Sequence, residues 1–134
     1  MEKTRSELRE KCMVILYQVE LMEKSNISYD IDNLIKDNIE IESEFVKEIV
    51  YGVTTHYNEI NDIINNHLIN WDISRIDKTG AAILRMACYE LAYTETPPIV
   101  VINEAINLAK KYSDDSVRKI INASLDRMMK SYER

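Results

Sequence analysis

The sequence predicts an all-α fold, a helical bundle of six or seven helices that forms a single domain over residues 1–134. Three observations lead to this fold class. Apolar residues recur at intervals of three and four along most of the chain, which is the period of an amphipathic helix. Glycine and proline each occur only twice, whereas an all-β sandwich needs turn residues roughly every ten positions. The chain is long enough to bury its own core, and no low-complexity stretch divides it.

Three helical patterns occupy the first half of the chain. A first helix is expected to end before Ser25, and a shorter one follows around residues 30–38. The apolar stripe of the first helix consists of Leu8, Cys12, Ile15 and Val19. The strongest pattern predicts one long helix over residues 44–70, with Ser43 as its N-cap. Gly52 lies inside it and costs about 1 kcal/mol relative to Ala, so we expect a close contact with another helix there.

The second half contains three further helices. Ser74 and Asp77 have the spacing of a capping box, so a helix should begin near them and continue over residues 81–93. The two prolines within residues 96–98 end that helix and begin the next one, because proline suits a first helical turn. A turn at residues 113–115 then precedes the last helix.

Candidate catalytic and metal-binding residues are scarce. His56 and His67 stand three helical turns apart, roughly 16 Å along a helix axis, which is too far to share a metal ion. We therefore expect no metal site and partly buried, hydrogen-bonded histidines. The chain has neither a Gly-rich phosphate loop nor a G-x-S-x-G motif. These features favour a protein that is not an enzyme and needs no cofactor.

Cysteine usage and hydropathy point to the cytoplasm. Cys12 and Cys88 lie inside apolar patterns without a C-x-x-C spacing, so we expect two buried thiols in a reducing compartment. No apolar run approaches the roughly 18 residues that a membrane span needs. Residues 1–5 are polar and no uncharged segment of a signal peptide follows them. We expect a cytoplasmic protein with no membrane contact.

Charge is distributed unevenly along the chain. The formal net charge is −6, which taken alone disfavours a nucleic-acid partner. Residues 1–11 carry a net charge of +1 and residues 110–134 carry +3, whereas the middle, residues 12–109, carries −10. The two ends therefore suit an anionic partner, and the middle suits a basic one.

Basic residues near the N-terminus are candidates for phosphate binding. They are Lys3, Arg5, Arg9 and Lys11. The planar guanidinium of arginine suits phosphate oxygens, and Tyr17 offers a stacking surface for an unpaired base. Glu7 and Glu10 nearly neutralise the segment, so the pattern alone favours an ordinary mixed-charge helix end.

Two acidic residues stand in apolar surroundings. Glu90 lies in a run of buried-looking residues, and Glu104 follows an apolar run with only Asn103 between. A carboxylate near a core needs a partner, and Arg85 or Lys110 is the expected one.

Several stretches resemble, in order, the motifs of the NusB family of bacterial transcription antitermination factors. Residues 83–91, ILRMACYEL, resemble the family's LRxxxYEL helix, and residues 98–110 resemble its VxINEAIxLAK segment. Residues 121–126, INASLD, resemble its closing FVNGVLD motif. Upstream, residues 16–18 match ALYQ, and residues 67–75 match HLxxWxxxR. The resemblance covers nearly the whole chain.

The resemblance implies an all-helical fold of a three-helix and a four-helix half with a non-enzymatic role. Family members pair with NusE, a ribosomal small-subunit protein, and bind the boxA element of ribosomal RNA in an RNA polymerase antitermination complex. The family's RNA-binding positions fall here on Arg5, Arg9, Tyr17 and Lys119. Departures from the family pattern occur at Ser6, Glu7, Ile120 and Ala123. They imply modest affinity for RNA alone and tighter binding with NusE.

Some alternatives stay open at this stage. The chain is either an RNA-binding adaptor or a NusB-like protein-interaction module whose RNA site is weakened or lost. The NusB-like domain of RNA cytosine methyltransferases is disfavoured, because these residues include no Rossmann domain. The acidic middle, near Glu90 and Asp114, is where a basic protein partner would dock. Some relatives associate through the RNA face, so a homodimer also remains open.

Overall fold

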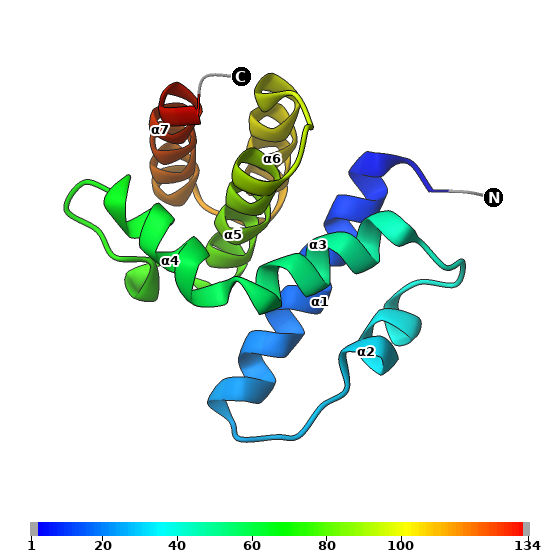
Figure 1. Ribbon diagram of the computed structural model, residues 1–134. Helices are drawn as coiled ribbons and strands as arrows, with labels where there is room; N and C mark the ends of the chain where they lie inside the picture. Colours follow the sequence, from blue (N-terminus) through cyan, green and yellow to red (C-terminus); the bar gives the residue numbers. More distant parts are fainter. Residues whose placement is uncertain (1–2, 133–134) are drawn as a thin grey trace.

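Seven α-helices and one 3₁₀ turn make up residues 3–132, the part of the chain described by this computed structural model. The helices are α1 (Arg5–Lys24), α2 (Ile31–Asn38), α3 (Glu44–Thr55), α4 (Tyr57–Asn66), α5 (Lys78–Tyr93), α6 (Pro98–Tyr112) and α7 (Asp115–Tyr132). The 3₁₀ turn, Ile73–Arg75, lies between α4 and α5. Figure 1 shows α5, α6 and α7 side by side in one group, with α1, α2 and α3 forming the other. The predicted all-α fold is confirmed.

The central helix of the bundle is α5. It contacts α1, α3, α4, α6 and α7, and every residue from Gly80 to Leu91 is buried. The sequence pattern predicts one buried face for this helix, but neighbours surround it on all sides. A helix in that position must be apolar around most of its circumference, which explains the nearly continuous apolar run in the sequence.

Side-chain caps fix where the helices begin. Thr4 and Glu7 form a reciprocal capping box at the start of α1. The Ser43 hydroxyl accepts a hydrogen bond from the backbone N–H of Val46 at 3.2 Å, which confirms the predicted N-cap of α3. Asp77 caps α5 by accepting from the N–H of Gly80 at 3.1 Å. Ser74 instead belongs to the 3₁₀ turn.

The long helix predicted over residues 44–70 is wrong, because the chain breaks at His56. The α3 helix ends at Thr55 and α4 begins at Tyr57, while His56 itself has φ −103° and ψ 26°. The bend lets α3 contact α1 while α4 contacts α5. Tertiary packing therefore overrides an apolar pattern that continues through the break.

Gly52 on α3 lies against the ring of Tyr89 on α5, as its place in the pattern predicts. A Cβ atom at Gly52 would stand 2.2 Å from the nearest ring atom of Tyr89. The phenol group of Tyr89 extends on to Glu48, to which it donates a hydrogen bond of 3.4 Å. Only a residue without a side chain allows this close approach of α3 and α5.

Both histidines contact neighbouring side chains or backbone atoms, and neither belongs to a group of metal-ligating residues in the described part of the chain. The ring of His56 stacks on Tyr93 with centroids 4.4 Å apart. His67 contacts the carbonyl oxygen of Ile63 at 2.7 Å and the hydroxyl of Ser131 at 3.0 Å. Within residues 3–132 no cluster of His, Cys, Asp or Glu is arranged to hold a metal ion.

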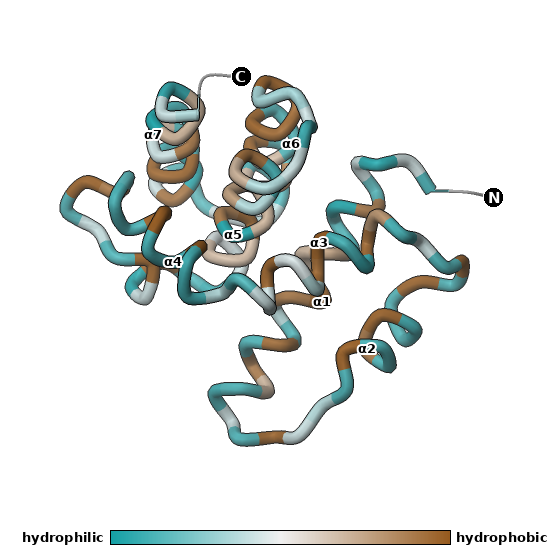
Figure 2. Tube along the Cα trace, in the orientation of Figure 1, coloured by the Kyte–Doolittle hydropathy of each residue, from teal (hydrophilic) through white to brown (hydrophobic). Residues whose placement is uncertain are grey.

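The interior is one apolar cluster that draws on every helix. Figure 2 shows hydrophobic and hydrophilic residues alternating around most of the helices, as amphipathic packing requires. Cys12 and Cys88 are free thiols in this core, and burial raises the pKa of each to about 12. No helix in the described ranges is long and apolar enough to cross a membrane.

Candidate nucleic-acid interface

A buried ion pair joins the first helix to the central helix. The Nε and Nη2 atoms of Arg9 on α1 donate to the two carboxylate oxygens of Glu90 on α5, each at 2.8 Å. The two side chains are only 6% and 2% exposed. Burial opposes the charge of Arg9, but the hydrogen bonds and charge of Glu90, with Glu104 beside them, outweigh it and raise the pKa of Arg9. This two-bond geometry is the strongest that arginine and a carboxylate form.

The ion pair changes the roles expected from the sequence. Arg9 was expected to contact RNA and Glu90 a protein partner, but both side chains lie in the core and bind each other. Both are therefore engaged with each other inside the core and not at the surface. Arg85, one of the two cations expected to pair with these carboxylates, instead binds Glu20 at 3.1 Å and Asn61 at 2.9 Å.

Two positions that depart from the family pattern have structural roles. The hydroxyl of Ser6 donates to Glu104 on α6 at 2.6 Å. Glu7 accepts from the backbone N–H of Thr4 at 2.9 Å, and this hydrogen bond lowers the pKa of its carboxyl. Ser6 therefore links the first turn of α1 to α6, and Glu7 completes the capping box that begins the helix.

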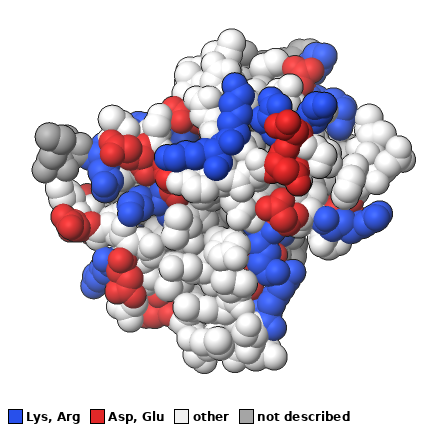
Figure 3. Space-filling view, turned by 180° about the vertical axis from the view of Figure 1, so that it is seen from behind, with Lys and Arg blue, Asp and Glu red and all other residues white. Residues whose placement is uncertain are grey.

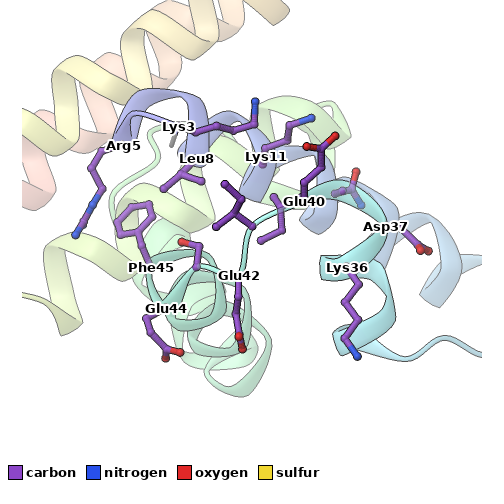
Figure 4. Close-up of a pocket in the computed structure, with 14 residues that line it drawn as sticks. Lys3, Arg5, Leu8, Lys11, Lys36, Asp37, Glu40, Glu42, Glu44 and Phe45 are labelled. Carbon is purple, nitrogen blue, oxygen red and sulfur yellow. The ribbon is translucent and has the colours of Figure 1, made fainter. Parts of the chain in front are cut away.

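A groove of about 900 Å³ separates the start of α1 from α2 and the loop that follows it. Its four basic residues are Lys3, Arg5, Lys11 and Lys36. None of these four forms an ion pair with another described residue. Figure 4 shows Lys3 and Lys11 on the α1 side of the groove, with Glu42 and Glu44 on the opposite side. The basic charges of this groove are thus available to an anion.

Acidic side chains also line this groove, and Lys47 offsets two of them. It forms an ion pair with Glu42 and another with Glu44 at 3.9 Å. The hydrogen bond from Lys47 lowers the pKa of Glu42. Asp37 and Glu40 complete the acidic lining. The groove is therefore a mixed surface of cations and carboxylates.

Arg5 lies against an aromatic ring within the groove. Its guanidinium carbon is 4.3 Å from the centroid of the Phe45 ring, a cation–π distance. Figure 4 shows the Arg5 side chain running beside that ring. The contact leaves the N–H donors at the guanidinium edge for a phosphate while holding the group in place.

Tyr17 and Lys119 do not line this groove. Tyr17 is half-buried on α1, two turns beyond Glu10 on the same side of the helix. Lys119 is exposed on α7. Tyr17 therefore shares α1 with Arg5 but lies outside the groove, and Lys119 belongs to a separate helix.

The C-terminal end of α6 contacts α1 through the carboxylate of Glu10. Lys111 forms an ion pair with Glu10 at 3.2 Å, and the hydroxyl of Tyr112 donates to the same carboxylate. The hydrogen bond from Tyr112, together with Lys111, lowers the pKa of Glu10. Figure 3 shows Lys and Arg side chains over much of the rear face, most densely in its upper half, with Asp and Glu among them.

Asp114, the second expected contact for a protein partner, is exposed and caps α7. Its Oδ1 atom accepts from the N–H of Val117 and from the hydroxyl of Ser116, each at 2.9 Å. The hydrogen bond from Val117 lowers the pKa of Asp114. Asp114 thus stabilises the start of α7, and its carboxylate is also exposed to solvent.

Sequence reasoning missed Lys36 and Phe45 as members of the groove. Lys36 lies on a short helix whose place against α1 is set by packing, and nothing in its neighbouring residues signals that placement. Phe45 is the only phenylalanine of the chain. Its place in an apolar stripe suggests core packing, and only the structure shows Arg5 stacked against it.

The fold and its grooves define an all-helical protein whose charged surfaces suit the binding of another macromolecule. The chain belongs to the NusB family, whose model matches residues 6–130. It is 43% identical over 127 residues to the transcription antitermination protein NusB of Staphylococcus carnosus, covering 93% of this chain and 98% of that protein. The NusB of Bacillus subtilis is 35% identical over 130 residues, covering 96% and 97%. The resemblance seen in the motifs is confirmed.

Solved structures share the arrangement of helices. NusB of T. maritima superposes with a TM-score of 0.85 at 27% identity, covering 100% of this chain and 96% of that one. The antitermination factors NusB and NusE in complex with double-stranded RNA give a TM-score of 0.82 at 26% identity, covering 98% and 100%. The bent α3–α4 pair thus occurs within a fold that known NusB proteins share.

Proposed function

We propose that this chain is a transcription antitermination factor that binds boxA-type RNA together with NusE. As part of an RNA polymerase complex it suppresses premature termination in ribosomal RNA operons. The family membership and the relatives named as antitermination proteins support this proposal. So does the similarity to NusB in its complex with NusE and RNA. We further propose that it acts in the cytoplasm and has no catalytic role.

The groove beside α1 is the observation that carries the proposal. Four basic side chains that form no ion pair with another described residue line it, and Arg5 stands beside an aromatic ring. Phosphates along a single strand need such spaced cations, and an unpaired base can stack on a guanidinium plane or a ring. The four carboxylates of the same groove weaken the attraction, so RNA binding by this chain alone should be modest. NusE would add basic surface and tighten the complex.

Titration of labelled boxA RNA tests the proposal. Fluorescence anisotropy should show preference for boxA over a scrambled strand, and affinity should rise when NusE is present. The measurement is repeated at several salt concentrations, because each phosphate contact on a single strand contributes about −0.7 to the slope of log K against log salt. No preference for boxA in either condition would refute the proposal.

Variants of the groove locate the binding surface. Arg5→Ala and Lys11→Ala should each weaken binding and flatten the salt slope. Lys24→Ala is the matched control, because it removes a basic, 58% exposed side chain from the far end of the same helix. Helix content by circular dichroism should stay unchanged in all three variants. Equal losses in the groove variants and in the control would remove the groove from the site.

A second candidate function is a NusB-like protein-interaction module with a weakened RNA site. The burial of Arg9 and the carboxylates of the groove favour it, because they reduce the cationic surface open to RNA. Under this alternative the protein binds NusE with the same affinity whether or not boxA RNA is present. Asp114 is the candidate contact for that basic partner, since it is exposed and ionised. Cooperative binding of NusE and RNA would exclude this alternative.

A further inference from the structure

A second cavity lies between residues 71–77 and the turn that joins α6 to α7. Its volume is about 340 Å³, within the range of small-molecule sites, which is roughly 300–1,000 Å³. Trp71 and Tyr112 line it from the two segments that bound it, and each is 43% exposed. Ile76, Val117 and Ile120 supply an apolar lining. We call this cavity the Trp71 pocket.

Two exposed aromatic rings in one cavity suit a flat ligand. Leaving large apolar rings in water forgoes the stabilisation that their burial brings, so exposed rings that share a cavity indicate a ligand surface. Trp71 also carries the guanidinium of Arg75, whose central carbon is 5.5 Å from the ring centroid. Aromatic and guanidinium planes are the surfaces on which unpaired bases stack.

Polar groups in the Trp71 pocket fit the edge of a base. The Oγ atom of Ser113 is buried and is the single side-chain polar atom of this kind without a hydrogen-bond partner in residues 3–132. A donor or acceptor on a base edge would supply that partner. The two carboxylates of the lining, Asp77 and Asp114, each accept from a backbone N–H at the start of a helix. The positive ends of those helices offset their charge, so an RNA strand can approach.

The Trp71 pocket is linked to α1 and lies close to Lys119, one of the RNA contacts that the family resemblance implies. Tyr112 lines the pocket and also donates its hydroxyl to Glu10 on α1. Ser116 lines the pocket as well, and Lys119 follows it by one helical turn. Both Lys119 and α1 are therefore within reach of a strand that places one base in this pocket.

We propose that the Trp71 pocket binds one unpaired base of the RNA strand, stacked on the indole of Trp71 beside Arg75. This inference rests on the proposed function and adds a base-binding site to it. The bound chemistry is a planar, uncharged ring with hydrogen-bonding edges, attached to a phosphate backbone that lies over Lys119.

Trp71 is the only tryptophan in the chain, so tryptophan emission reports on this pocket alone. Single-stranded boxA RNA is titrated into the full chain while tryptophan emission and the anisotropy of the labelled RNA are recorded together. The expected result is quenching that saturates at the same RNA concentration as the anisotropy. Binding seen by anisotropy with unchanged emission overturns this inference and leaves the proposed function standing. No rise in anisotropy, with or without NusE, overturns both.

Variants and modified RNA sharpen the test. Trp71→Ala should weaken RNA binding by about tenfold, and Trp71→Phe should restore most of it, since a stacked base contributes about 1–3 kcal/mol. Ile69→Ala is the matched control, because it removes a 63% exposed apolar side chain two residues away that does not line the pocket. Equal effects of Trp71→Ala and Ile69→Ala overturn the inference.

A strand in which one nucleotide at a time lacks its base should identify the bound position. Quenching should disappear for one position and persist for the others. Quenching that survives every single removal overturns the inference. Emission that changes on addition of NusE alone, and not of RNA, assigns the pocket to the protein partner and overturns it as well.

Discussion

Replacing Arg9 by alanine leaves the Glu90 carboxylate in the core without the guanidinium that now binds it. Two hydrogen bonds of 2.8 Å disappear, and the carboxylate is only 2% exposed. Removing one partner of a buried ion pair costs about 3–5 kcal/mol, far more than the pair contributes relative to well-packed apolar residues. With a urea m-value of about 2 kcal/mol/M, a loss of about 4 kcal/mol lowers the unfolding midpoint by about 2 M.

Urea denaturation followed by circular dichroism measures this loss. Lys36→Ala is the control, because it removes an exposed basic side chain that forms no ion pair with another described residue and should change stability by less than about 0.5 kcal/mol. The double variant Arg9→Met/Glu90→Leu removes both charges and should recover most of the lost stability. At low temperature, where Arg9→Ala remains folded, its RNA affinity and salt slope should match those of the parent protein.

Two results would refute this reasoning. A loss of stability below about 1 kcal/mol in Arg9→Ala would mean that the carboxylate finds water or another cation at once. A smaller salt slope for folded Arg9→Ala would mean that the guanidinium turns out of the core to contact phosphate. Recovery by the double variant but not by either single variant is the pattern expected of a buried pair.

Three further predictions follow from packing, burial and charge. Gly52→Ala should destabilise the protein by about 1–2 kcal/mol in urea, because overpacking against Tyr89 exceeds the gain in helix propensity; an unchanged midpoint would mean that the ring moves aside freely. Cys12 and Cys88 should resist alkylation by iodoacetamide at pH 8 until urea unfolds the chain, because burial raises the pKa of both thiols to about 12; rapid labelling of the native protein would contradict their burial. The lowered pKa of Glu10 implies that its ionised carboxylate stabilises the fold above the ordinary pKa of 4.5, and that this stability is lost as the pH falls through the lower pKa of the folded state. Glu10→Gln should therefore lose less stability than the parent protein between pH 6 and pH 3. Identical pH profiles of the two proteins would contradict the contact of Glu10 with Tyr112 and Lys111.

Local signals in the sequence predict most of the helices. Ser43 caps α3 as its hydroxyl and position indicate, and Pro98 opens α6 as its missing N–H suits. The break at His56 has no such signal, since neither proline nor glycine stands there and the apolar period continues from Val53 to Ile60. It arises because α3 packs on α1 as well as on α5, whereas α4 packs on α5. That arrangement depends on residues elsewhere in the chain.

The same limit applies to the site. The apolar run around Glu90 predicts that this carboxylate is buried and needs a cation, and that expectation is correct. The identity of the cation is not readable from nearby residues, because Arg9 precedes Glu90 by 81 positions. Arg5 and Arg9 also look alike in the sequence, one turn apart, yet one faces the groove and the other the core. Which of them turns inward depends on where α5 lies.

The 81-residue separation of Arg9 and Glu90 has a consequence for folding during synthesis. The first helix is made before its main packing partners, because most of the residues that it contacts belong to α3 and α5. At a synthesis rate of about 5–20 residues per second, roughly 4–16 seconds pass between the synthesis of Arg9 and that of Glu90. During that interval α1 must stay unaggregated with its apolar stripe uncovered. The charged residues interspersed along α1 keep the nascent segment hydrated until the central helix arrives.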